Sequence, residues 1–146
     1  MAMARAKNAV GQTALMAAVW DGNEDLIRLL VEKGYADLEA RDASLNGKTP
    51  LMSAAYSKNA NLVMYLLSQK ANVNARKVDG WAVLSIAIEG GSPDVVKLLV
   101  ENGADLTVKT PKGLSVVQLA EGWYQQSRGE SNYRAIADYL RSKGAK

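Results

Sequence analysis

The sequence contains no cysteine and no histidine, and these two absences exclude most common catalytic and metal-binding sites. Without them there is no thiol nucleophile, no Cys–His dyad, no Ser-His-Asp triad and hardly any way to build a zinc site. The missing cysteines also exclude a disulfide, so cysteine usage does not indicate the redox compartment. No acidic cluster has the spacing of a calcium loop. We therefore expect no enzyme, no metal and no cofactor.

Phenylalanine is also absent and aromatic residues make up only 6%, so the core must be built from Leu, Val, Ile, Ala and Met. No apolar run approaches the ~20 residues that a membrane helix needs, and we expect no membrane association. The chain has 146 residues, 48% apolar and 23% charged, which is typical of one globular domain. Its net charge of +3 is a mild excess, whereas a nucleic-acid binder usually concentrates charge more strongly.

The N-terminus, Met1-Ala2-Met3, reads like an added start in front of a trimmed natural sequence. A targeting segment would then have been removed, so its absence says little about the compartment. The localisation stays unknown, with the periplasm slightly favoured over the cytoplasm.

An internal repeat runs through the chain, marked by glycines spaced 36, 33 and 33 residues apart: Gly11, Gly47, Gly80 and Gly113. A small residue returns seven positions after each glycine: Ala18, Ala54, Ala87 and Ala120. A second apolar block follows, as in Val95-Val96-Lys97-Leu98-Leu99, and ends near a turn such as Asn102-Gly103. This pattern predicts two helices per repeat, and one pair cannot bury both of its faces alone. Stacked pairs would therefore form a solenoid.

Local signals agree with this pattern. Thr13 and Thr49 precede the first helices and can accept hydrogen bonds from free helical N–H groups, while Pro50 suits a first turn. Gly34 and Gly103 can adopt the left-handed conformation that ends a helix. Small alanines in the first helices allow close approach of neighbouring repeats.

The motif Gly47-Lys48-Thr49-Pro50-Leu51, the following Ala54-Ala55, and Val96-Lys97-Leu98-Leu99 with Gly103-Ala104-Asp105 resemble the ankyrin repeat. The resemblance covers roughly residues 8–146 and implies an all-α solenoid of stacked helix pairs with projecting turns. It divides the single domain, residues 1–146, into repeats at approximately 8–43, 44–76, 77–109 and 110–146.

The sequence departs from the family pattern at several points. The family's T-P-L-H histidine is replaced by Met16, Met52, Ser85 and Gln118, and two glycine positions hold Lys58 and Lys70. The first inter-repeat connection is three residues longer, which places Tyr35 and part of residues 42–46 in an enlarged turn. The last repeat has eight extra residues within 123–132, predicted as an extension of its first helix followed by a surface loop. Residues 1–7 would form a partial cap, unless a preceding segment has been removed.

Asn46-Gly47-Lys48-Thr49 resembles the end of a phosphate-binding loop, but the required earlier glycine is Asp42. A repeat turn followed by a helix start explains these residues better. The carboxylates of Glu24 and Asp25 are best explained as favourable charges in the first turn of a helix.

The resemblance implies a concave binding face. It is formed by the residue after each opening glycine and by the two residues before the glycine that stands between the two helices of a repeat. All three tryptophans and Tyr56 fall at such positions, as expected of interface anchors. The alternative is that Trp123 packs under the inserted loop and Trp20 covers the open end. The complete set of candidate partner-binding residues is Trp20, Asp21, Lys48, Met52, Tyr56, Trp81, Ser85, Glu89, Trp123 and Tyr124.

Basic residues of the turns, against fewer acidic ones, predict a mildly positive edge: Arg41, Lys48, Arg76, Lys77, Lys109 and Lys112. This edge is either a solvated rim or a surface that attracts an acidic protein partner. Nucleic acid is a weaker alternative, because only Trp81 adds an aromatic ring to the turns.

By resemblance, the protein is a small stand-alone ankyrin protein of bacterial type, monomeric when unbound, that binds another protein without catalysis. The leading hypothesis is an inhibitor or immunity protein that masks an enzyme, one with an acidic patch. The alternative is a passive scaffold domain from a larger eukaryotic or effector protein.

Overall fold

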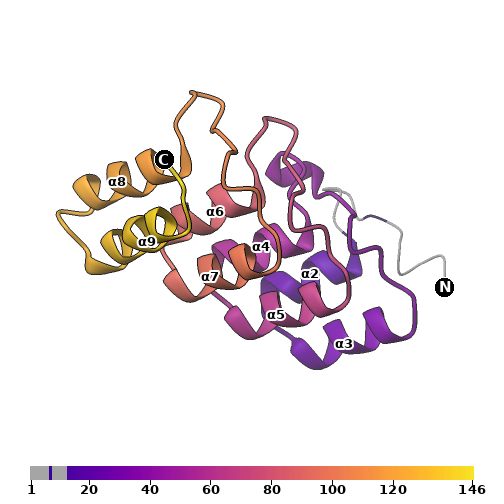
Figure 1. Ribbon diagram of the computed structural model, residues 1–146. Coiled ribbons are helices and arrows are strands. Elements are labelled where there is room, and N and C mark those ends of the chain that lie inside the picture. Colours follow the sequence, from indigo (N-terminus) through magenta and orange to yellow (C-terminus); the bar gives the residue numbers. More distant parts are fainter. Residues whose placement is uncertain (1–6, 8–12) are drawn as a thin grey trace.

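The computed structural model describes residue 7 and residues 13–146, and in this part of the chain it shows four stacked helix pairs (Figure 1). The first helices of the pairs form one row: α2 (Ala14–Asp21), α4 (Pro50–Tyr56), α6 (Val83–Gly90) and α8 (Val116–Gln126). The second helices form a parallel row: α3 (Glu24–Glu32), α5 (Ala60–Ser68), α7 (Pro93–Glu101) and α9 (Ser131–Ser142). This arrangement confirms the all-α solenoid of helix pairs.

Hairpin-like turns connect successive pairs and project from the helices on the side of the first row (Figure 1). Each turn is closed by a single antiparallel bridge: Asp42–Lys48, Arg76–Ala82 and Lys109–Ser115. The first turn contains the short 3₁₀ helix η1 (Ala43–Leu45), which accommodates the extra residues expected there. Neighbouring turns also bond to each other, because Val78 N–H donates to the Asn46 carbonyl at 3.1 Å.

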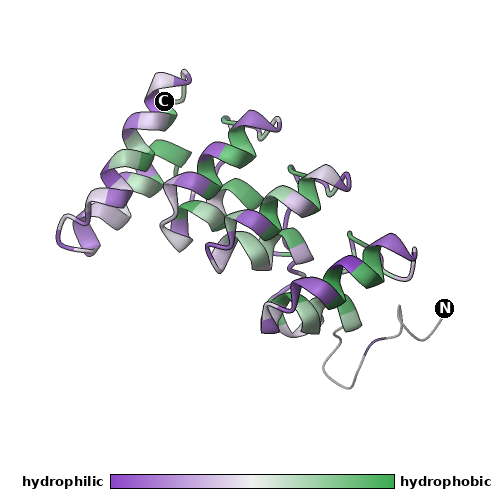
Figure 2. Ribbon diagram, turned by 90° about the horizontal axis from the view of Figure 1, so that it is seen from below, coloured by the Kyte–Doolittle hydropathy of each residue, from purple (hydrophilic) through white to green (hydrophobic). Residues whose placement is uncertain are grey.

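The core lies between the helices, and the ribbon segments coloured as hydrophobic gather on the sides where the helices face one another (Figure 2). The four alanines predicted at close helix contacts are all buried: Ala18, Ala54, Ala87 and Ala120. Gly90 has the same purpose at the end of α6, since an added Cβ there would lie 2.9 Å from the Tyr56 carbonyl oxygen. Small residues therefore set the spacing between α4 and α6.

Three of the first helices begin with a capping box, two at the predicted Thr13 and Thr49 and one at Ser115. In α4 the Thr49 hydroxyl accepts from Met52 N–H at 3.3 Å, and Thr49 N–H donates to the Met52 sulfur at 3.4 Å. The methionine sulfur thus accepts a hydrogen bond from the capping residue, at the position where the family has histidine. In α6 the capping position is Ala82, and no side chain caps that helix.

The two lysines at family glycine positions adopt left-handed backbone conformations, with φ of 61° at Lys58 and 73° at Lys70. A side chain raises the energy of this conformation relative to glycine. The family's preference for glycine here is therefore explained by the backbone.

The last repeat has a longer first helix, followed by an exposed turn. Helix α8 continues to Gln126, and exposed residues 128–130 form the turn before α9. Asn132, which was included in the predicted insertion, instead lies in the first turn of α9 and donates to the Gly91 carbonyl at 2.6 Å. The insertion therefore ends before Asn132.

The first pair has no described neighbour on its outer side. Leu26 of α3 is 38% exposed, whereas Leu62, its equivalent in α5, is 2% exposed. The expected cap formed by residues 1–7, like the opening Gly11, lies outside the described residues except for Lys7. The Lys7 ammonium donates to the Arg41 carbonyl at 2.9 Å.

Candidate partner-binding groove

One position near the end of each first helix faces the space beside the turns. In chain order it is occupied by Trp20, Tyr56, Glu89 and Gly122. Trp20 is 70% exposed and Tyr56 is 46% exposed, so neither ring is used to fill the core. These rings fall where the sequence predicted interface anchors.

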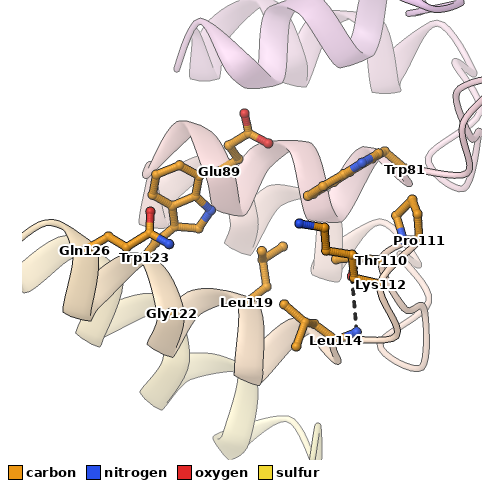
Figure 3. Close-up of a pocket in the computed structure, with 10 residues that line it drawn as sticks. All are labelled: Trp81, Glu89, Thr110, Pro111, Lys112, Leu114, Leu119, Gly122, Trp123 and Gln126. Atoms are coloured by element: carbon orange, nitrogen blue, oxygen red, sulfur yellow. Dashed lines mark hydrogen bonds between the residues drawn. The ribbon is translucent and has the colours of Figure 1, made fainter.

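A cavity of about 320 Å³ lies between α6, α8 and the third turn, and we call it the tryptophan cavity (Figure 3). Trp81 and Trp123 stand at opposite sides of it, with Glu89 between them and Leu119 below. The remaining lining residues are Thr110, Pro111, Lys112, Leu114, Gly122 and Gln126. Most of this lining is apolar, as in typical ligand-binding cavities.

A second cavity of about 240 Å³, the lysine cavity, adjoins the first and shares Trp81 and Glu89 with it. Its other lining residues are Lys48, Tyr56, Lys77 and Ile86. Because the two cavities share lining residues, they form one hollow between the turns and the first helices. It brings together five of the predicted site residues: Lys48, Tyr56, Trp81, Glu89 and Trp123. We use the name groove for this hollow together with the exposed Trp20 ring, which occupies the position of Tyr56 in the first repeat.

The depth of the groove has a local cause at Gly122. The equivalent positions in the other repeats hold Trp20, Tyr56 and Glu89, whereas the fourth repeat has no side chain there. A Cβ added at Gly122 would meet nothing within 4 Å. The tryptophan cavity therefore exists because one repeat lacks the side chain that the other repeats place at this position.

The lysine cavity contains an electrostatically strained ammonium group. The Lys48 ammonium lies over the Tyr56 ring, 4.5 Å from its centroid. Burial, and then repulsion by Lys77, lower the pKa of Lys48, while Glu89 and Asp42 raise it. Lys77 pairs with Asp79 at 3.4 Å. An anionic partner group near Lys48 would relieve part of the burial and repulsion cost.

Helix α9 supports the groove from behind. Tyr133 stacks against Trp123 with a centroid distance of 6.1 Å, and its hydroxyl donates to the Glu89 carbonyl at 3.2 Å. Burial is the largest cause that raises the pKa of Tyr133. These contacts hold the Trp123 ring and the end of α6 in fixed positions, as a preorganised binding surface requires.

Two predicted site residues are corrected by the structure. Met52 is 0% exposed, because its sulfur accepts the hydrogen bond from Thr49 N–H, and Ser85 is 1% exposed in α6. Neither side chain can contact a partner. Each lies one turn before Tyr56 or Glu89 on the same helix face, but at the buried start of its helix rather than at the more exposed end.

The remaining predicted residues lie at the edges of the groove. Asp21 is exposed beside Trp20 at the end of α2. Tyr124 packs against the core and the inserted turn, where its ring lies 3.6 Å from a Cβ placed at Gly129. The sequence left open that Trp123 packs under the inserted loop. Tyr124 is the residue that lies against that turn, whereas Trp81 and Trp123 are half-buried and line the tryptophan cavity.

Sequence reasoning missed several apolar residues that line the tryptophan cavity, among them Leu114 and Leu119. Leu114 follows Gly113 exactly as Trp81 follows Gly80, so the rule that selected Trp81 could also have selected it. Leu119 had no such signal, because its equivalent position is exposed in the first repeat, partly buried in the second and buried in the third.

The basic residues of the turns have mainly structural contacts. Arg41 donates to the carbonyls of Gly47 and Arg76, and Arg76 donates to the Gly80 carbonyl. These bonds stiffen the turns and leave less of the positive edge available for a partner. Across the described residues, no three potential metal ligands gather in one place, and no helix could cross a bilayer.

The second helices present another exposed surface. Leu29 of α3 and Met64 of α5 are about half exposed, and the Arg28 guanidinium lies over the Tyr65 ring at 4.3 Å. Cavities on this side are lined mainly by polar residues of α3 and α5. This face serves as a useful comparison surface for the groove.

Comparison with known proteins agrees with the repeat pattern. Residues 37–110 match the family described as ankyrin repeats (3 copies), and residues 10–43 match the ankyrin repeat. The fourth helix pair lies beyond these matched residues.

Among similar curated proteins, the B-cell lymphoma 3 protein homolog of Mus musculus is 33% identical over 96% of this chain and 28% of its own length. The ankyrin repeat and SAM domain-containing protein 6 of Rattus norvegicus is 40% identical over 63% of this chain and 10% of its length. The tyrosine-protein kinase Shark of Drosophila melanogaster is 33% identical over 92% of this chain and 13% of its length. The chain therefore spans less than a third of the length of these relatives. The matched families and the stacked helix pairs establish that this chain belongs to the ankyrin-repeat family, whose repeats form non-catalytic protein–protein interaction modules.

Proposed function

We propose that the chain binds its partner protein in the groove and inhibits that partner, an enzyme, by masking its surface. The observation that carries this proposal is the row of aromatic rings along the first helices. Trp20 and Tyr56 are exposed at the same position of successive repeats, and Trp81 and Trp123 line the adjoining cavity. Exposed rings do not stabilise the isolated fold, whereas rigid aromatics supply large contact areas at low entropic cost on binding.

Charge supports a partner with acidic groups at the lysine cavity. A carboxylate placed near Lys48 would offset the burial, and then the repulsion from Lys77, that lower the Lys48 pKa. Such a pair would add specificity and a faster association rate rather than most of the affinity.

The test combines affinity capture with matched surface variants. Wild type, the groove variant Trp20→Ala/Tyr56→Ala and the second-helix variant Leu29→Ala/Met64→Ala are immobilised separately and exposed to extract of the source organism. All four side chains are about half exposed or more, so the variants should fold alike. A true partner is retained by wild type and by the second-helix variant and is lost from the groove variant.

Calorimetry with the purified partner then measures the loss. We expect each aromatic truncation to weaken binding by about 2 kcal/mol, roughly thirtyfold, if the ring is a hot spot. A stoichiometric amount of wild type should abolish the partner's activity. Binding that depends on Leu29 and Met64 instead would refute the groove, and full activity of the bound partner would refute masking.

A passive scaffold is the second candidate. It is favoured by the relatives, in which the matching segment is a small part of much longer proteins. The same activity measurement separates the two, because a scaffold leaves its bound partner active.

A further inference from the structure

The tryptophan cavity has the features of a pocket for one particular kind of side chain. Its volume is about 320 Å³, twice the roughly 150 Å³ that holds a benzene molecule. Two indole rings form its sides and Leu119 its floor (Figure 3). The size and the apolar walls fit a planar ring together with the chain that carries it.

Glu89 supplies the polar feature of this cavity. Its backbone carbonyl accepts from the Tyr133 hydroxyl, but its carboxylate makes no hydrogen bond or ion pair with any described residue. A carboxylate accepts hydrogen bonds only, so it calls for a donor from the occupant. A plain hydrocarbon ring would leave this demand unmet.

The surrounding charges exclude a cation as the best donor. Lys112 reaches into the cavity from the third turn, and Lys48 lies in the adjoining cavity close enough for Glu89 to raise its pKa (Figure 3). An arginine or lysine beside Glu89 would be repelled by both ammonium groups. A neutral donor meets no such repulsion, and an aromatic face can itself attract the Lys112 ammonium.

We propose that the tryptophan cavity receives a tyrosine side chain of the partner, with its ring between Trp81 and Trp123 and its hydroxyl donating to Glu89. This rests on the proposed function, since it names what the partner inserts into the groove. The tyrosine ring covers the apolar surface that both indoles expose, and its hydroxyl donates a hydrogen bond to the Glu89 carboxylate. The Lys112 ammonium lies over the face of the same ring. Both indoles and the two charged groups of the cavity then each have a role that matches their chemistry.

The first experiment needs no partner protein. The chain has three tryptophans, so its proton–nitrogen NMR spectrum has three indole N–H signals, assigned by single Trp→Phe variants. The probes are N-acetyl-tyrosine amide, N-acetyl-phenylalanine amide and N-acetyl-arginine amide. We expect the tyrosine probe to shift the signals of Trp81 and Trp123 saturably and to leave that of Trp20 unchanged.

Two variants test the geometry. Gly122→Leu places a side chain in the cavity where a Cβ meets nothing, and it should remove the shifts without unfolding the chain. Glu89→Ala removes the acceptor, so the preference for the tyrosine probe over the phenylalanine probe, about tenfold in wild type, should disappear. Equal shifts at Trp20, tighter binding of the arginine probe, or unchanged binding in Gly122→Leu would each overturn the proposal.

Binding measurements with a purified partner distinguish the inserted tyrosine from the proposed binding of the partner in the groove. If the partner loses affinity with Trp20→Ala/Tyr56→Ala but not with Gly122→Leu, the groove binds the partner without an inserted tyrosine. If neither variant affects the partner while the tyrosine probe still binds the cavity, the cavity stands and the proposed function fails.

Discussion

The missing helix cap of the third repeat provides a quantitative prediction. Ala82 has φ and ψ of −83° and 159°, close to the −85° and 165° of Thr49 at the same place in the second repeat. Both residues are buried to a similar degree, so the second repeat shows that this position can hold threonine. We expect Ala82→Thr to gain the hydrogen bond from the backbone N–H of Ser85.

The expected gain follows from the known cost of losing such a cap, about 1 kcal/mol within a range of 0.5–2. Ala82→Thr should therefore raise the free energy of unfolding by about 1 kcal/mol, and the melting temperature by about 2–4 °C for a chain of this size. Thr49→Ala should lower the free energy by a similar amount, since it removes the bond to Met52 N–H at 3.3 Å.

Urea unfolding followed by circular dichroism measures both changes. Ala82→Val is the matched control, because valine has the shape of threonine without its hydroxyl and should not stabilise the chain. If Ala82→Thr is no more stable than Ala82→Val while Thr49→Ala is destabilised, then the third repeat is not built on the same cap geometry as the second.

Three further outcomes are expected. Lys58→Gly should raise the free energy of unfolding by about 0.5 kcal/mol, because Lys58 has a left-handed φ of 61° that glycine adopts without strain. Lys33→Gly is the control in the same urea assay: Lys33 has a φ of −82°, so glycine there should lower the free energy of unfolding by about 0.5–1 kcal/mol. Tyr139→Phe should raise it by about 1 kcal/mol, since the buried Tyr139 hydroxyl has no hydrogen-bond partner among the described residues, while Tyr133→Phe should lower it by about 1 kcal/mol. Trp20→Ala should change it by no more than about 0.5 kcal/mol, as at an ordinary surface site, and a larger loss would mean that the ring is part of the core.

The repeat architecture could be predicted from the sequence because its signals are local and recur. The spaced glycines, the alanines such as Ala54 and Ala87, and the capping threonines each act within one helix pair, so the same short-range physics applies in every repeat. Exposure of Trp20 and Tyr56 followed from the same register. Met52 and Ser85 were assigned wrongly because they share a helix face with Tyr56 and Glu89 but lie one turn earlier, where the start of the helix is buried.

The binding surface itself was decided by tertiary structure. The tryptophan cavity needs α6, α8 and the third turn to meet, and it is open only because Gly122 stands where other repeats have large side chains. The position of Trp123 depends on Tyr133 from α9, and the pKa of Lys48 is lowered by burial and then by Lys77 from the next turn. The first contact joins the two helices of one pair and the second joins neighbouring turns, so neither can be read from the local sequence. Repetition determined the helices and their order, whereas the differences between the repeats, brought side by side by stacking, determined the shape and charge of the groove.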